Sequence, residues 1–173
     1  MYKFRLFKLL LAYLMGKRQD DLRVPVNVRL RVTPFEAELT HASSYSYMAY
    51  AALGRWSWNL ACMDLGRMWR ERWTPFTHSE LVYYRRALSV FDRVELSTTL
   101  IWWDEKMAWF EHRISHEGQL AAIVYSRGAF YSQGKRVPLG MDRHGRPVPL
   151  PDSKPAIVDA WTATDAEFKK SLG

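Results

Sequence analysis

Apolar and polar residues alternate near the start of the chain, and this alternation predicts a β-strand over residues 22–32. Every second residue from Leu22 to Val32 is leucine or valine. A period of two places these side chains on one face of a strand, where they can be buried together. Pro34 ends the pattern, and a loop rich in acidic and hydroxyl residues follows over residues 35–41.

The next segment, residues 42–63, predicts one long helix. Arg55 is its only charged residue, and small and aromatic residues recur at helical spacing. Ser43 or Ser44 is suited to cap its N-terminus. A helix of about six turns that is apolar nearly all round is either buried or inside a membrane. Arg55 and Asn59 argue against the membrane, because a charge near the helix centre is costly there.

The second half of the chain predicts an antiparallel sheet of four or five strands between residues 77 and 139. Polar turns separate short runs of strand-forming residues, and Gly128 predicts a bulge in the last long run. A single sheet has one face to bury, and the nearly uncharged helix suits that face. The expected strands span residues 79–88, 94–103, 107–115 and 119–131, and residues 64–72 are expected to be the exposed end of the central helix.

The C-terminal part is expected to drape over the surface. Five of the eight prolines fall within residues 138–155, which favours an extended path. Residues 164–172 predict a short terminal helix, because acidic residues come early in it and lysines late, as the helix dipole favours.

Composition indicates one globular domain with a basic surface. The chain has 173 residues, of which 48% are hydrophobic and 25% charged, a balance unlike that of a disordered protein. A net charge of +7 suits an anionic partner, which could be nucleic acid, a lipid surface or a phosphorylated small molecule. The basic residues are spread along the chain without a recognition motif, so we expect no nucleic-acid partner.

Cysteine and histidine usage narrows the chemistry. Cys62 is the only cysteine, which excludes an intramolecular disulfide and a cysteine-rich zinc site. On an apolar helix, a free cysteine usually acts as a small hydrophobic residue. The histidines lack metal-ligand spacing, so we expect no metal. A reducing compartment follows, and we expect the cytoplasm.

Residues 1–19 carry five basic residues and no acidic one. Only eight uncharged residues separate Lys8 from Lys17, far fewer than the roughly 20 that span a bilayer. The segment resembles a basic amphipathic helix that lies either on a membrane or on the protein's own surface. Residues 1–18 are therefore a candidate for peripheral membrane contact.

Two stretches carry a resemblance to a known family. The first contains RVTP at 31–34, His41, Tyr47 and LGR at 53–55. The second runs through YRRAL at 84–88, Phe91, WDEK at 103–106, EHR at 111–113, GQLAA at 118–122 and RGAF at 127–130. Over roughly residues 3–139, the chain resembles the hotdog-fold acyl-CoA thioesterases, specifically the thioesterase-like branch of the 4-hydroxybenzoyl-CoA thioesterase group.

The resemblance implies an α+β hotdog fold, in which an antiparallel sheet wraps around a long central helix. We expect a basic N-terminal helix over residues 1–20, a hotdog domain over residues 21–139 and a proline-rich tail over residues 140–173. The implied substrate is an acyl-CoA or acyl-carrier thioester, with coenzyme A (CoA) as part of the substrate and no other cofactor. Related proteins form their acyl pocket between two protomers, which implies a homodimer or a homotetramer built from two dimers.

The family's catalytic pattern is Asp-x-Asp, a short turn, and His-Met-Asn-Asn at the start of the central helix. In this chain Glu36 and Glu38 stand at the aspartate positions, His41 keeps its place, and Ala-Ser-Ser replaces Met-Asn-Asn at residues 42–44. The second acid serves as nucleophile or general base in the family, and this role passes to Glu38. Glu36 is expected to be structural.

Thioester hydrolysis needs donors for the carbonyl oxygen and a base or nucleophile for the carbonyl carbon. A helix N-terminus supplies free N–H groups and a positive dipole end, which also keeps a nearby carboxylate ionised. The predicted catalytic residues are Glu38, His41 and Ser43, with His41 or Ser43 positioning the water or the thioester. The predicted substrate-binding residues are Thr40, Ser44, Tyr47, Arg85, Arg86 and Arg127, the arginines being candidates for the phosphates of CoA.

Two other functions stay open at this point. The chain could be a non-catalytic acyl-thioester or lipid-binding protein with a degenerate site, because its motif departs from the family pattern. It could also be a membrane-surface protein recruited through residues 1–18. Acyl-CoA turnover separates the first alternative from the enzyme, and vesicle binding tests the second.

Overall fold

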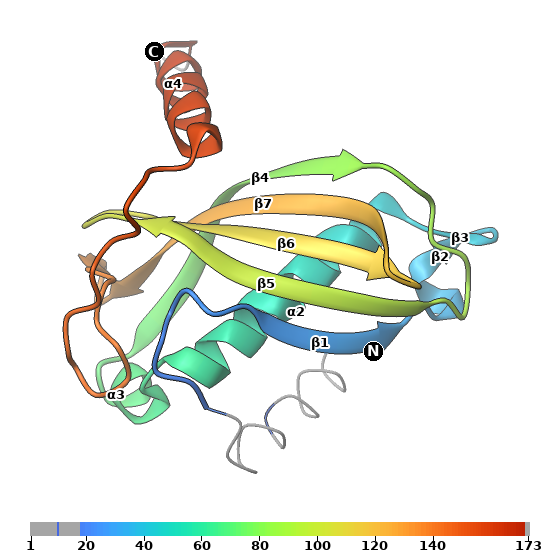
Figure 1. The fold of residues 1–173 in the computed structure, drawn as a ribbon. Coiled ribbons are helices and arrows are strands. Elements are labelled where there is room, and N and C mark those ends of the chain that lie inside the picture. Colours follow the sequence, from blue (N-terminus) through green and yellow to red (C-terminus); the bar gives the residue numbers. More distant parts are fainter. Residues whose placement is uncertain (1–9, 11–17, 172–173) are drawn as a thin grey trace.

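The structure is a computed structural model that describes residue 10 and residues 18–171. A curved antiparallel sheet packs one face against the long helix α2 (Figure 1). The order of the main strands is β1-β5-β6-β7-β4, and β8 pairs with β7 at one end. The strands are β1 (Val26–Arg31), β4 (Trp73–Tyr84), β5 (Arg93–Trp103), β6 (Ala108–His116), β7 (Gln119–Ser132) and β8 (Lys135–Val137).

Helix α2 (Ser44–Cys62) confirms the predicted central helix. Its N-terminal half packs Tyr50 and Ala51 in one buried cluster with strands β1, β5, β6 and β7. Its C-terminal half packs Trp58 in a second cluster, with the Trp58 ring edge against Phe110. The sheet and helix therefore share one apolar layer, which confirms the hotdog arrangement of an α+β protein.

A small folded unit that the sequence did not predict comes directly before the central helix. A short helical turn, η1 (Pro34–Glu36), leads into a two-stranded hairpin formed by β2 (Ala37–Glu38) and β3 (His41–Ala42). Ser43 then occupies the N-cap position of α2. The loop before the helix is thus a small folded unit rather than an open turn.

Several element boundaries differ from the predictions. Strand β1 (Val26–Arg31) begins at Val26 instead of residue 22, because residues 21–24 form a turn in which the Val24 N–H donates to the Asp21 carbonyl oxygen. Strand β4 spans Trp73–Tyr84 instead of residues 79–88, and its register shifts between Thr77 and Ser79, across from Gly128. The bulge therefore lies on β4, while Gly128 provides room: a Cβ there would come within 2.6 Å of the Phe76 carbonyl oxygen. Residues 64–72 are not the end of the central helix but contain a separate helix, α3 (Leu65–Arg70), whose N-cap Asp64 accepts a hydrogen bond from the Arg67 N–H.

The terminal helix α4 (Ala156–Ser171) is longer than the predicted 164–172 and projects away from the sheet beyond β4 (Figure 1). Arg127 of β7 holds it through a hydrogen-bonded ion pair with Asp165, with an N–O distance of 2.6 Å. Val158 is the buried residue of this helix.

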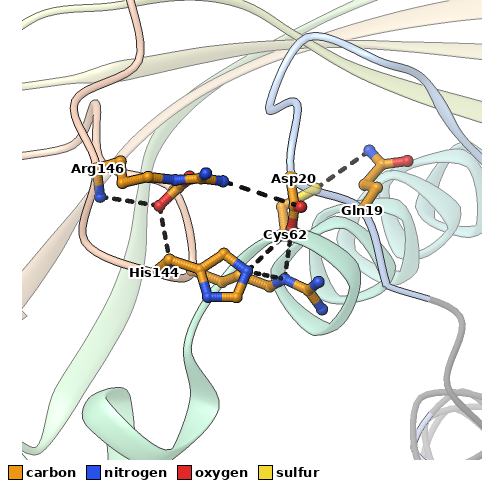
Figure 2. Close-up of polar contacts among 7 residues, drawn as sticks. Gln19, Asp20, Cys62, His144 and Arg146 are labelled. Carbon is orange, nitrogen blue, oxygen red and sulfur yellow. Dashed lines mark hydrogen bonds and ion pairs between the residues drawn. The ribbon is translucent and has the colours of Figure 1, made fainter.

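The segment that enters the domain meets the turn over residues 142–146 beside the end of α2 (Figure 2). Gln19 donates a side-chain hydrogen bond to the Cys62 sulfur at 3.2 Å. Next to it, Asp20 forms ion pairs with Arg143 at 2.5 Å and with Arg146 at 3.9 Å. The turn over residues 142–146 thereby fastens the tail to the segment that enters the domain. The predicted helix over residues 1–20 falls mainly outside the described residues.

Candidate active site

Hairpin β2–β3, the first turn of α2 and the loop over residues 85–88 meet at the N-terminus of α2. The Ala42 N–H donates to the Leu88 carbonyl oxygen at 2.7 Å, and His41 forms a β-bridge with Ser89. These backbone contacts fasten the hairpin to the chain that leaves β4. Residues far apart in the sequence are thus brought to one end of the central helix.

Glu36 organises the entry to α2. Its Oε2 atom accepts hydrogen bonds from the backbone N–H and the hydroxyl of Thr33, each at 3.0 Å, and from the Tyr50 hydroxyl at 3.2 Å. Its carbonyl oxygen accepts from the Ser43 N–H at 2.9 Å and from the Ser46 hydroxyl at 2.5 Å. This carboxylate is therefore occupied in holding the loop, in agreement with the structural role expected for it.

Glu38 is exposed on hairpin β2–β3, where it pairs with His41 across the two strands. None of the residues that the structure describes forms a hydrogen bond or an ion pair with the Glu38 carboxylate. Leu39 at the turn is fully exposed and has a φ of 60°, a left-handed conformation that is uncommon for a residue with a side chain. The Thr40 hydroxyl lies 2.8 Å from His41 Nδ1. A carboxylate, a hydroxyl and an imidazole thus face solvent on one small hairpin.

A shallow hollow of about 320 Å³ opens beside this hairpin, at the first turn of α2. Ser44, Tyr47, Arg85 and Arg86 line it. The N–H groups of both arginines donate to the Ala121 carbonyl oxygen, at 2.8 and 2.9 Å, so their backbone is fixed while their side chains are exposed. The remaining lining residues are Ala42, Tyr84 and Ala87.

Tyr47 connects the floor of the hollow to its arginines. Its hydroxyl donates to the Arg86 carbonyl oxygen at 3.4 Å and accepts from the Leu88 N–H at 3.2 Å. Its ring meets the Tyr84 ring edge-on, with centroids 5.1 Å apart. Burial raises the pKa of the Tyr47 phenol, so this group remains a neutral donor at physiological pH.

The hollow combines two sources of positive potential. The N-terminus of the 19-residue helix α2 contributes unpaired N–H groups and the positive end of its dipole. Arg85 and Arg86 contribute exposed guanidinium groups, which suit phosphate oxygens. The arrangement can therefore bind an anionic ligand and polarise a carbonyl oxygen.

The structure brings four of the predicted site residues together in the hollow: Ser44, Tyr47, Arg85 and Arg86. Ser43 lies at the N-cap of α2, with its hydroxyl 3.0 Å from the Ser46 hydroxyl. Arg127 does not join the hollow, because its side chain is buried and its guanidinium pairs with Asp165. Glu38, Thr40 and His41 occupy the adjoining hairpin.

Tyr84 and the Glu36–Tyr50 contact were not predicted as part of the site. Tyr84 ends β4 and lies directly before the two arginines, and this adjacency was the available sequence signal. The Glu36–Tyr50 contact joins residues 14 apart across a loop, so no periodic pattern reports it.

Other reactive groups of the described chain do not form a second centre. Cys62 is buried, and burial raises the pKa of its thiol to about 12, which keeps it protonated at neutral pH. Among the described residues, no three His, Cys, Asp or Glu side chains gather closely enough to hold a metal ion.

Comparison with known proteins identifies the fold family. The family model described as the thioesterase-like superfamily matches residues 36–162. Among curated proteins, none matches the chain. The similar solved structures include a probable thioesterase from Bartonella henselae, with a TM-score of 0.59 and 13% identity over 67% of this chain and 99% of that chain.

Two further similar structures contain CoA. A hypothetical protein from Staphylococcus aureus in complex with CoA has a TM-score of 0.60 and 16% identity, over 70% of this chain and 80% of that chain. A thioesterase from Thermus thermophilus, complexed with coenzyme A and zinc, has a TM-score of 0.58 and 19% identity, over 66% of this chain and 84% of that chain. At these identities the likeness shows the fold.

Proposed function

Because the chain belongs to the thioesterase-like superfamily, we propose that it hydrolyses an acyl-CoA thioester to a free acid and CoA. The observation that carries this proposal is the hollow at the N-terminus of α2, where Ser44, Tyr47, Arg85 and Arg86 meet. The two arginines are suited to CoA phosphates, and the helix N-terminus is suited to the thioester oxygen. CoA in two of the similar structures supports this substrate class.

Glu38 is the proposed base or nucleophile. As a base, its carboxylate takes a proton from water, and the water oxygen attacks the thioester carbonyl carbon. The carbon–sulfur bond then breaks, and CoA leaves as the thiol after it regains a proton. As a nucleophile, the carboxylate attacks the same carbon, the carbon–sulfur bond breaks and CoA leaves, and a mixed anhydride with Glu38 remains. Water then cleaves the anhydride to the free acid and the Glu38 carboxylate. Two observations support either role. Glu38 lies on the hairpin next to the hollow, and its carboxylate does not accept the loop hydrogen bonds that occupy the Glu36 carboxylate.

We propose that the working form is a homodimer. Strand β4 is an edge strand of 12 residues. Three of its large apolar side chains are exposed to about half or more: Phe76 at 57%, Leu81 at 49% and Tyr83 at 64%. A long edge with exposed apolar side chains is a template for pairing with another chain. A second copy on this edge would cover these side chains. The oligomeric state in solution, measured by light scattering, tests this part.

The decisive experiment is thiol release from acyl-CoAs of different chain lengths. Glu38→Gln is expected to lower kcat by at least roughly 100-fold. Glu105→Gln, the same change on another exposed turn, is the matched control and should leave kcat unchanged. Calorimetry with CoA completes the test: saturable binding without turnover would identify the non-catalytic alternative, and neither binding nor turnover would refute both.

A further inference from the structure

A wide apolar groove lies toward the other end of α2 from the hollow. It has a volume of about 670 Å³ and lies between the C-terminal half of α2, helix α3 and the start of β4. Trp56, Leu60, Met68, Trp69 and Trp73 supply most of its wall. A groove of this size and composition on a protein surface usually receives a partner.

The rim of this groove presents an aromatic ring to solvent. Trp69, on the short helix α3, is 88% exposed. Arg70 follows it directly and Arg72 lies three residues after it, and both are exposed. Glu71, between the two arginines, is paired with Arg67. An exposed tryptophan next to arginines is typical of a surface that enters the headgroup region of a bilayer, since the ring has an apolar body and a polar edge. We call this surface, formed by Trp56, Trp69, Arg70, Arg72 and Trp73, the tryptophan end.

Gln19, near the N-terminal end of the described chain, lies at the same place. The Gln19 N–H donates to the Ala61 carbonyl oxygen at 3.0 Å, which places the entry of the chain beside the end of α2. Leu10 also lines the groove. Arg70 and Arg72 are exposed on this side of the protein, and an anionic surface is complementary to their charge.

We propose that the tryptophan end docks on the surface of an anionic lipid bilayer, with Trp69 at the level of the headgroups. The apolar ring contributes burial, and the basic residues contribute attraction to anionic lipids. Among the described residues, no helix is both long and apolar enough to cross a bilayer, which fits attachment at the surface. The contact is independent of thioester hydrolysis, so it goes beyond the proposed function.

Co-sedimentation with lipid vesicles tests this contact. The full chain is expected to pellet with vesicles of phosphatidylcholine and phosphatidylserine, and much less with phosphatidylcholine alone. Trp69→Ala should weaken binding roughly tenfold, because it removes the most exposed apolar side chain of the tryptophan end. Phe168→Ala is the matched control: it truncates an aromatic ring that is 65% exposed on α4, and it should bind like the unmodified protein.

Charge is tested separately. Arg70→Gln and Arg72→Gln should each weaken binding to the anionic vesicles by roughly fivefold, and added salt should reduce the difference. Equal binding to both vesicle types, or undiminished binding of Trp69→Ala, overturns the proposal. Loss of self-association by Trp69→Ala with unchanged vesicle binding also overturns it and assigns the groove to a second copy of the chain. Thiol release is measured on the same samples, so failure of the enzyme proposal is recognised independently.

Discussion

Arg55 and Glu80 form an ion pair whose Nη1–Oε1 distance is 2.5 Å, and it joins the middle of α2 to the edge strand β4. The two side chains are only 18 and 13% exposed. Arg55 is the only charged residue of α2, and its partner Glu80 lies on β4, the strand at one edge of the sheet. The pair explains how a charged residue is accommodated inside a mostly apolar layer.

Removing one member of this pair should destabilise the protein. Glu80→Gln leaves the Arg55 guanidinium largely buried without a counter-charge, and we expect a loss of about 2 kcal/mol in the free energy of unfolding. The double variant Arg55→Met, Glu80→Leu should recover most of that loss, because no uncompensated charge remains. Urea denaturation checks both; a double variant as unstable as Glu80→Gln would contradict this account.

Gly54 is required by the close approach of α2 to the sheet. A Cβ at this position would lie 2.2 Å from Thr98 Oγ1 and 3.0 Å from His112 Nδ1. Gly54→Ala should therefore cost about 1 to 3 kcal/mol of stability, although alanine is the better helix former. Gly66→Ala on α3 is the control, since its Cβ meets only a side-chain oxygen at 3.2 Å. Thermal unfolding of both variants measures the difference.

His112 should make the fold sensitive to mild acid. Burial, followed by the positive charge of Arg55, lowers the pKa of His112 well below its usual range. The folded protein therefore keeps a neutral imidazole, hydrogen-bonded to Thr98 and Ser126, while the unfolded chain takes up a proton near pH 6.5. Stability is full above that pH and falls as the pH drops below it, by up to about 1.4 kcal/mol per pH unit.

Denaturation midpoints between pH 8 and 5 measure this effect. His112→Gln should flatten the dependence, and an NMR titration should find the native His112 ring neutral throughout. A ring that titrates near its ordinary pKa would contradict the assignment.

Arg127 should act on the terminal helix and not on substrate. Hydrogen bonds from Arg127 and then Lys169 lower the pKa of Asp165 to about 2. The contribution of the ionised Asp165 carboxylate to stability is complete above about pH 4 and is lost as the pH falls toward 2. Arg127→Gln is expected to loosen α4 and to speed hydrogen–deuterium exchange of its backbone amides. Glu167→Gln, which removes an exposed pair with Lys170, serves as the comparison and should leave that exchange rate unchanged.

Tyr47 is expected to act by holding the loop over residues 85–88. Tyr47→Phe removes the hydrogen bond to the Leu88 N–H and should cost about 1 kcal/mol of stability. If the hollow binds CoA, the variant should raise KM more than it lowers kcat, because Arg86 loses a backbone contact. A lowered kcat with unchanged KM would place Tyr47 in the chemical step instead.

The sheet and the central helix could be predicted because their apolar residues follow simple periods. Strand β5, for example, buries every second residue from Val94 to Leu100. The beginning of β4 could not be predicted, since Pro75 and the bulge near His78 interrupt the alternation on an edge strand. The prediction missed the first turns of α4. Val158 is the buried residue of this helix, and a single buried residue produces no periodic pattern.

The candidate site could be predicted where its residues stand at the start of the central helix, as Ser44 and Tyr47 do, or directly after a strand, as Arg85 and Arg86 do. Arg85 and Arg86 follow β4 directly and reach the hollow together. The role of Arg127 could not be predicted, because the register of β7 decides which face of the sheet its side chain is on. Its ion-pair partner Asp165 is also 38 residues away in the sequence. The branch of the superfamily and the domain boundaries stay predictions.

The length of α2 separates two surfaces of the protein. Its 19 residues span roughly 28 Å, with the hollow at the first turn and the groove along the last turns. A molecule resting on lipid through Trp69 would hold the hollow in the aqueous phase. Acyl chains would then have to arrive as water-soluble thioesters, and the released fatty acid would enter water before any membrane.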